Sequence, residues 1–139
     1  MDILLAPDVY VNASVALGTP PDHVVQRVLG KHKGESKTSG WVLERVQHML
    51  ESVPEFKKEQ VGQQLDLIRG LVEVIDVDGD FGPGDWQGAL VAAAKAAGAQ
   101  RVVTDHPDLL DKESSDGVEF LSTEAWLLEV TTPPPAPGG

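Results

Sequence analysis

Apolar residues along this chain follow two different spacings, and the two spacings alternate. Short apolar segments, typical of buried strands, lie at Ile3–Ala6, Arg101–Thr104 and Val118–Leu121, and Leu71–Ile75 alternates as a strand does. Between these runs, apolar residues return every three or four positions, as they do on a helix that covers a sheet. The alternation predicts an α/β fold, with three α/β/α layers and a central parallel sheet of about four to five strands.

Capping and turn residues mark where the helices begin and end. Helices are predicted over Val9–Leu17, from the Pro20-Pro21 pair onward, from Ser39 to Glu51, from a Ser52–Glu55 capping box to Gly70, from Asp85 to Gly98, and over Glu124–Val130. The polar run Gly30–Gly40 predicts an exposed mobile loop. The sequence thus indicates one domain over residues 1–130, followed by a disordered Pro/Gly-rich tail over 131–139.

Charge and composition narrow the classes of function. The formal net charge of −11 argues against a general nucleic-acid binder, which carries a basic face, and it suits docking onto a basic partner segment. The absence of cysteine excludes disulfides and thiolate metal sites. We expect neither a signal peptide nor a membrane span at the start, since Pro7 interrupts its apolar run. These features suit a cytoplasmic protein.

Carboxylates follow the predicted strands at several points. Asp8 comes after the first strand, Asp85 opens an Ala-rich helix, and Asp105 and Asp108 follow the strand over residues 101–104. Glu44 lies on a helix that could lean over the same sheet edge, where open α/β sheets place ligand groups. Several carboxylates at one cleft indicate a hard cation, Mg²⁺ or Mn²⁺, which can activate water and stabilise the leaving oxygen of a phosphodiester.

Each of these residues also has a purely structural explanation. Asp8 and Asp85 are common types at helix N-caps, and Asp108 can cap the short turn that follows it. An isolated Glu44 is most simply a solvated residue paired with a basic neighbour on its helix, and His106 a partly exposed loop histidine. The metal hypothesis therefore depends on the residues converging at one place.

Four stretches of the chain together resemble the PIN domain family, which includes the ribonuclease toxins of toxin–antitoxin pairs: ILLAPDVYVNASVAL, SGWVLERVQHML, DWQGALVAAAKAAGAQRVVTDHPDLL and GVEFLSTEAWLLEV. The resemblance implies a metal-dependent ribonuclease that cleaves single-stranded RNA with Mg²⁺ or Mn²⁺. The site residues that it implies are catalytic Asp8, Glu44, Asp85 and Asp108, metal-binding Asp8, Asp85, Asp105 and Asp108, and substrate-binding Asn12, Thr104 and His106. The implied partners are RNA and a basic antitoxin or other protein, with a homodimer as a further expectation.

Two positions depart from the pattern of the family. Asp8 aligns with the family's Asn, which leaves Ala6 where the family has its first Asp. His106 stands where the family has another Asp, with Asp105 one residue early. Two hypotheses follow: the shifted acids still reach a metal, or the chain is a catalytically weak PIN-like module that binds a partner protein or RNA. A phosphoacceptor receiver domain, with similar layers, is disfavoured because no Lys follows the strand ending at Leu121.

Overall fold

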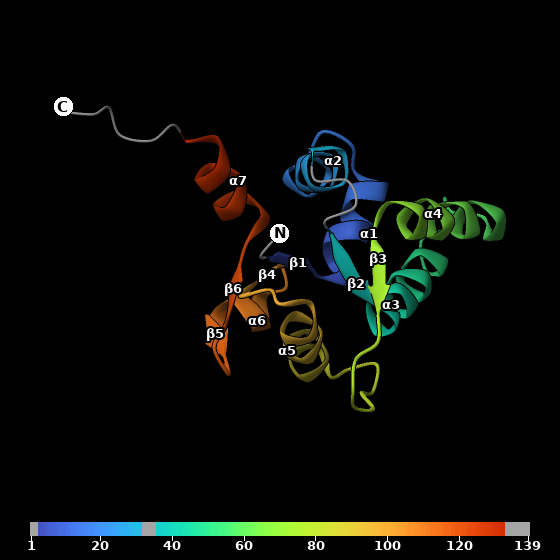
Figure 1. The fold of residues 1–139 in the computed structure, drawn as a ribbon. Helices are drawn as coiled ribbons and strands as arrows, with labels where there is room; N and C mark the ends of the chain where they lie inside the picture. Colours follow the sequence, from blue (N-terminus) through green and yellow to red (C-terminus); the bar gives the residue numbers. More distant parts are fainter. Residues whose placement is uncertain (1–2, 32–35, 133–139) are drawn as a thin grey trace.

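The computed structural model describes residues 3–31 and 36–132, which form a mixed α/β fold of short strands and longer helices (Figure 1). In chain order the elements are β1 (Ile3–Leu5), α1 (Pro7–Val15), α2 (Pro20–Lys31), β2 (Lys37–Ser39), α3 (Gly40–Glu51), α4 (Lys58–Leu71), β3 (Glu73–Ile75), α5 (Trp86–Ala97), β4 (Arg101–Val103), α6 (Pro107–Lys112), β5 (Ser114–Ser115), β6 (Val118–Leu121) and α7 (Thr123–Thr131). The predicted α/β class, with a mostly parallel sheet covered by helices, is confirmed.

The strands form two ladders. Four strands are paired in the order β1-β4-β6-β5, and β2 and β3 form a separate parallel pair. Within the four-stranded ladder, β1, β4 and β6 are parallel, with Leu5 opposite Val103 and Val103 opposite Leu121, whereas the short β5 is antiparallel to β6. The carboxyl ends of β1, β4 and β6 therefore lie side by side at one end of the strands, which we call the carboxyl edge of the sheet.

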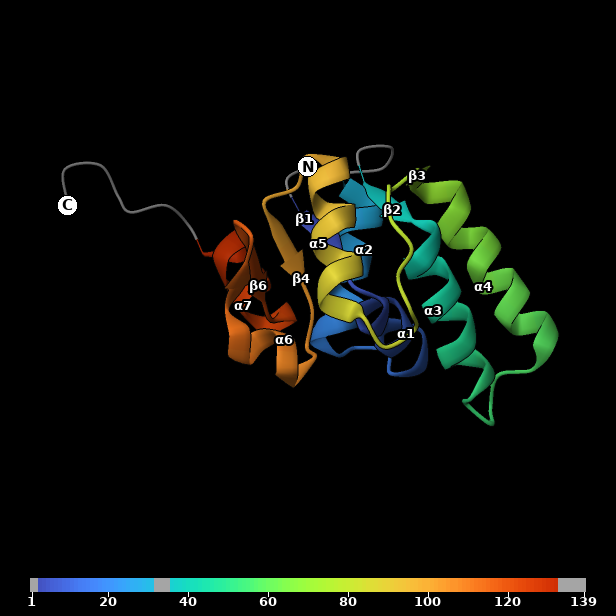
Figure 2. The ribbon, with the colours of Figure 1, turned by 90° about the horizontal axis from the view of Figure 1, so that it is seen from below.

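Helices cover both faces of the strands. Figure 1 shows α5 on one side of the strands and α1 and α2 on the other. In Figure 2, α3 and α4 lie side by side next to β2 and β3, whereas α6 and α7 lie at the opposite end, near β6. Within the described ranges, no helix is long and apolar enough to cross a membrane.

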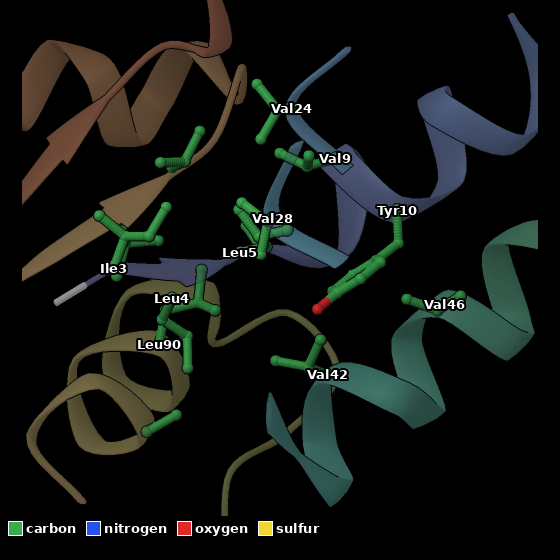
Figure 3. Close-up of a cluster of buried hydrophobic side chains, with 14 of the residues drawn as sticks. Ile3, Leu4, Leu5, Val9, Tyr10, Val24, Val28, Val42, Val46 and Leu90 are labelled. Carbon is green, nitrogen blue, oxygen red and sulfur yellow. The ribbon is translucent and has the colours of Figure 1, made fainter. Parts of the chain in front are cut away.

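The core forms on both faces of β1. Leu4 points toward Leu90 of α5, whereas Leu5 lies with Val28 of α2 on the other face (Figure 3). All three residues of β1 are buried, as expected of a parallel strand covered by helices on both faces. Tyr10 of α1 is also fully buried, and burial raises the pKa of its hydroxyl.

Several predicted boundaries were wrong. The Ser52–Glu55 capping box does not start a helix: α4 begins at Lys58, where the Gln60 side-chain oxygen accepts a hydrogen bond from the Lys57 backbone N–H at 2.9 Å. Helix α1 begins at Pro7, two residues earlier than predicted, because proline is well suited to the first turn of a helix. Helix α7 continues to Thr131, and the rest of the predicted tail, 133–139, lies outside the described residues.

The segment predicted as an exposed loop contains a strand. Residues 37–39 form β2, in which Thr38 and Ser39 are buried, and the strand pairs in parallel with β3. The prediction failed because Lys, Thr and Ser carry little apolar signal, and the burial of this strand comes from elements distant in sequence. Residues 32–35, the centre of the predicted loop, lie outside the described residues.

Candidate functional site

Most of the predicted site residues follow β1 and β4, and β6 lies beside β4 in the same sheet. Because these strands are parallel and in register, the segments 6–8, 104–108 and 122–123 meet at the carboxyl edge of the four-stranded sheet. This is the edge at which open α/β sheets place their ligands, and of the predicted acids Asp8, Asp105 and Asp108 lie in the segments that meet there. The roles of the individual side chains differ from the prediction.

The buried carboxylate of Asp8 connects the segments after β1 and β4 by hydrogen bonds. It lies in the first turn of α1 and is 8% exposed. Its Oδ1 accepts a hydrogen bond from the Thr104 hydroxyl at 2.8 Å, and its Oδ2 accepts one from the backbone N–H of Asp105 at 2.8 Å. Burial raises the pKa of Asp8 above its ordinary value, although these two hydrogen bonds favour the charged form. Asp8 is therefore not an N-cap, and its carboxylate already connects two strands.

Asp105 continues the same network toward the C-terminal helix. Its Oδ1 accepts from the backbone N–H of Thr123 at 2.9 Å, and its Oδ2 accepts from the Thr123 hydroxyl at 2.7 Å. We call Asp8, Thr104, Asp105 and Thr123 the edge network. The predicted site residues did not include Thr123, although its place directly after a strand end, like that of Thr104, is a signal that could have identified it. The network connects β1, β4 and β6 at their carboxyl ends.

Thr104 and His106 were predicted to contact substrate. Thr104 is fully buried, and its hydroxyl accepts from the backbone N–H of His106 at 3.0 Å while it donates to Asp8. His106 caps α6, with its Nδ1 accepting from the backbone N–H of Asp108 at 3.3 Å. Its ring lies against Trp86, with 5.0 Å between the centroids. Asp108 is exposed in the first turn of α6, so the structure places it outside the edge network.

Asp85 acts as a helix cap. Its Oδ1 accepts from the backbone N–H of Gly88 at 3.0 Å, at the start of α5. A Cβ at residue 88 would lie 2.6 Å from Asp85 Oδ2, so a larger residue there would force the Asp85 carboxylate to move. Asp85 is exposed and lines a hollow with Lys95 and Ser115, which does not include Asp8. The structural explanation of Asp85 is thus confirmed.

Glu44 and Asn12 lie apart from the edge network. Glu44 is exposed on α3, 3.3 Å from Arg45 and 4.0 Å from His48. It lines a hollow with Asp76 and Asp80, between α3 and the loop that follows β3. Asn12 is exposed in the second turn of α1. Neither residue is joined to Asp8 or Asp105 by a contact that the structure shows.

The predicted carboxylates therefore do not assemble into one centre. Within residues 3–31 and 36–132, no group of three or more His, Asp or Glu side chains is arranged to hold a metal ion. Two of the acids, Asp8 and Asp105, are occupied by internal donors, and the position that the family fills with its first Asp is a fully buried Ala6. This arrangement does not fit the Mg²⁺ or Mn²⁺ site that the family resemblance implies.

Comparison with known proteins supports the fold. No protein-family model matches the chain, and a search of curated proteins gives no match. Among solved structures, the chain is similar to a chain of the VapBC2 complex from Rickettsia felis bound to a DNA fragment from its promoter. The TM-score is 0.61 at 17% sequence identity, and the match covers 88% of this chain and 98% of the other. This likeness establishes the fold. VapBC2 is a toxin–antitoxin complex.

Proposed function

We propose that this chain is a PIN-like module that acts by binding a partner protein, as one member of a toxin–antitoxin type of pair. The observation that carries the proposal is the state of the carboxyl edge. Asp8 and Asp105 are held by internal hydrogen bonds, so the acids that would form a nuclease centre serve as structural connections instead. Because the described residues assemble no group that could hold a metal ion, we propose that the protein acts by binding a partner at its surface.

An apolar hollow between α1, α2 and α4 is the best candidate for the binding surface. Leu17, which is 81% exposed, and Leu67, which is 55% exposed, line it together with buried residues of all three helices. Large apolar side chains that cluster in the open around a hollow are typical of a protein–protein contact. An amphipathic helix that places its apolar face in such a groove is a common binding mode.

The negative charge of the chain favours a partner with a basic surface. The chain carries a net charge of −11, and Asp66, next to Leu67 on α4, is 82% exposed and lies 3.8 Å from Arg69. A partner helix with Lys or Arg flanking its apolar face therefore complements this surface in both shape and charge. The similarity in fold to a chain of the VapBC2 complex supports a role in binding a partner protein. We place this role in the cytoplasm as part of the proposal.

Binding of a synthetic helix tests the proposal. The probe is a fluorescently labelled amphipathic peptide with a leucine face flanked by lysines, and anisotropy measures its affinity for the full chain. We expect Leu17→Asp with Leu67→Asp to weaken binding by about tenfold or more, since a charge in an apolar contact is costly. The matched control is Leu128→Asp, because Leu128 is 69% exposed but lies on α7, away from the hollow. Equal losses for both variants, or no binding at all, contradict the proposal.

A metal-dependent ribonuclease that cleaves single-stranded RNA is the second candidate. It is favoured by the position of Asp8, Asp105 and Asp108 in two segments that meet at one edge. It requires Glu44 and Asp85 to approach that edge. An Mn²⁺ titration of the full chain, followed by NMR line broadening, with cleavage of a single-stranded RNA oligonucleotide, separates the candidates. We expect no selective broadening at the edge and no cleavage; both effects together would establish the ribonuclease instead.

A further inference from the structure

Three aromatic rings form a continuous row near the carboxyl edge. Trp41 comes from the start of α3, Trp86 is the first residue of α5, and His106 follows β4. The ring centroids of Trp41 and Trp86 are 5.8 Å apart with the planes at 89°, and those of Trp86 and His106 are 5.0 Å apart at 53°. These spacings are those of aromatic rings in direct contact. The row therefore joins three elements that lie far apart in the sequence.

Hydrogen bonds hold the row at both ends. The indole Nε1–H of Trp41 donates to the backbone carbonyl of Gly82 at 3.0 Å. At the other end, the backbone N–H of His106 donates to the hydroxyl of Thr104, which belongs to the edge network. Trp86 lies between these two anchored rings and is half-buried. The rings are thus a fixed part of the fold.

Each ring comes from an element that also carries a predicted carboxylate. Trp41 shares α3 with Glu44, Trp86 directly follows Asp85, and His106 lies between Asp105 and Asp108. Where α3, the start of α5 and the segment after β4 face one another, the rings of Trp41, Trp86 and His106 are in contact. The carboxylates lie elsewhere: Glu44 faces the loop after β3, Asp85 caps α5, and Asp105 bonds to Thr123.

We infer that Trp86, the middle ring of the row, keeps these carboxylates apart and so prevents a divalent cation from binding at the edge. This inference rests on the proposed function, because it explains how a PIN-like fold comes to lack an assembled metal centre. Ala6 and His106, which stand where the PIN pattern has acids, are then only part of the difference. A third position, residue 86, must also change before the edge can bind a cation.

A stepwise reconstruction of the edge tests the role of Trp86. The starting variant combines Ala6→Asp with His106→Asp, and a second variant adds Trp86→Ala to this pair. Electron paramagnetic resonance of free Mn²⁺ measures binding without any assay of activity. We expect the variant with Trp86→Ala to bind Mn²⁺ about tenfold or more tightly than the starting variant, because the carboxylates of α3 and α5 can then approach the edge.

Two further variants make the outcome decisive. Trp86→Phe in the same background keeps a flat ring and is expected to bind Mn²⁺ no better than the starting variant. Trp86→Leu also removes the ring but keeps more apolar surface for the fold. It takes the place of Trp86→Ala, with the same expected gain in Mn²⁺ affinity, if circular dichroism shows that the alanine variant is unfolded. Equal Mn²⁺ affinity with and without the ring overturns the inference. Mn²⁺ binding at the edge of the unaltered chain is a different result, and it overturns the proposed function.

Discussion

Two acidic regions of this molecule use the same side chains in opposite ways. In the edge network, Asp8 is buried and its carboxylate accepts from a hydroxyl and a backbone N–H, each at 2.8 Å. Around the hollow beside α3, Glu44 is exposed and lies 3.3 Å from Arg45 and 4.0 Å from His48 of its own helix. The first region holds three strands together, whereas the second is open to water.

The difference between the two regions comes from the donors that surround each carboxylate. Thr104 and Thr123 supply hydroxyl and backbone donors at the sheet edge, and these donors offset the cost of burying Asp8 and Asp105. Glu44 is exposed and its ionic contacts are with Arg45 and His48 of its own helix, so its carboxylate stays solvated. An acidic residue at a predicted strand end can therefore be a structural connection as readily as a metal ligand, and the neighbouring threonines decide between the two.

The largest expected effect comes from removing the carboxylate of Asp8. Asp8→Ala leaves the Thr104 hydroxyl and the Asp105 N–H without their acceptor, and we expect the free energy of unfolding to fall by about 2–3 kcal/mol. Urea denaturation followed by circular dichroism measures the change. The control is Asp8→Asn, which keeps one acceptor oxygen and should cost clearly less. A loss below ~0.5 kcal/mol for the alanine variant would show that the edge network does not stabilise the fold.

A smaller effect is expected from pH. Because burial raises the folded-state pKa of Asp8 above 3.8, the folded chain holds this proton more tightly than the unfolded chain does. The stabilisation from this proton is complete below pH 3.8 and is lost as the pH rises through the folded-state pKa. The difference in unfolding free energy between the parent and Asp8→Asn should therefore decrease over this range. A difference that is flat with pH, or that increases, contradicts the assignment.

The smallest effect is expected at Glu44. Its side chain is 61% exposed, so water screens its ion pair with the largely buried Arg45, and Glu44→Ala should change the free energy of unfolding by less than ~0.5 kcal/mol. The same urea denaturation measures it, and Glu44→Gln separates the loss of charge from the loss of side-chain bulk. A loss similar to that of Asp8→Ala would mean that the two acidic regions are equivalent, which would remove the distinction between them.

Much of the fold could be predicted because its signals are local. Ser39 caps α3, Asp85 caps α5 and Gly98 ends α5 with a φ of 74°, each as the sequence indicated. The predictions that failed depend on distant partners. Strand β2 forms because β3 pairs with it, and the apolar periodicity after the Ser52–Glu55 pattern, at Val61, Leu65 and Ile68, belongs to a helix that begins only at Lys58. Local patterns cannot report such partners.

By itself, the sequence determined the α/β class, most of the helices and the strands β1, β3, β4 and β6. These follow from hydrophobic periodicity and from the parallel strands that it implies. Only the tertiary structure decided what the acids do at the carboxyl edge of the sheet. It placed Thr104 beside Asp8 and Thr123 beside Asp105, and it put Trp86 between Trp41 and His106. The physical reason is that a carboxylate takes its role from the donors, cations or rings around it, and these come from segments far apart in the chain.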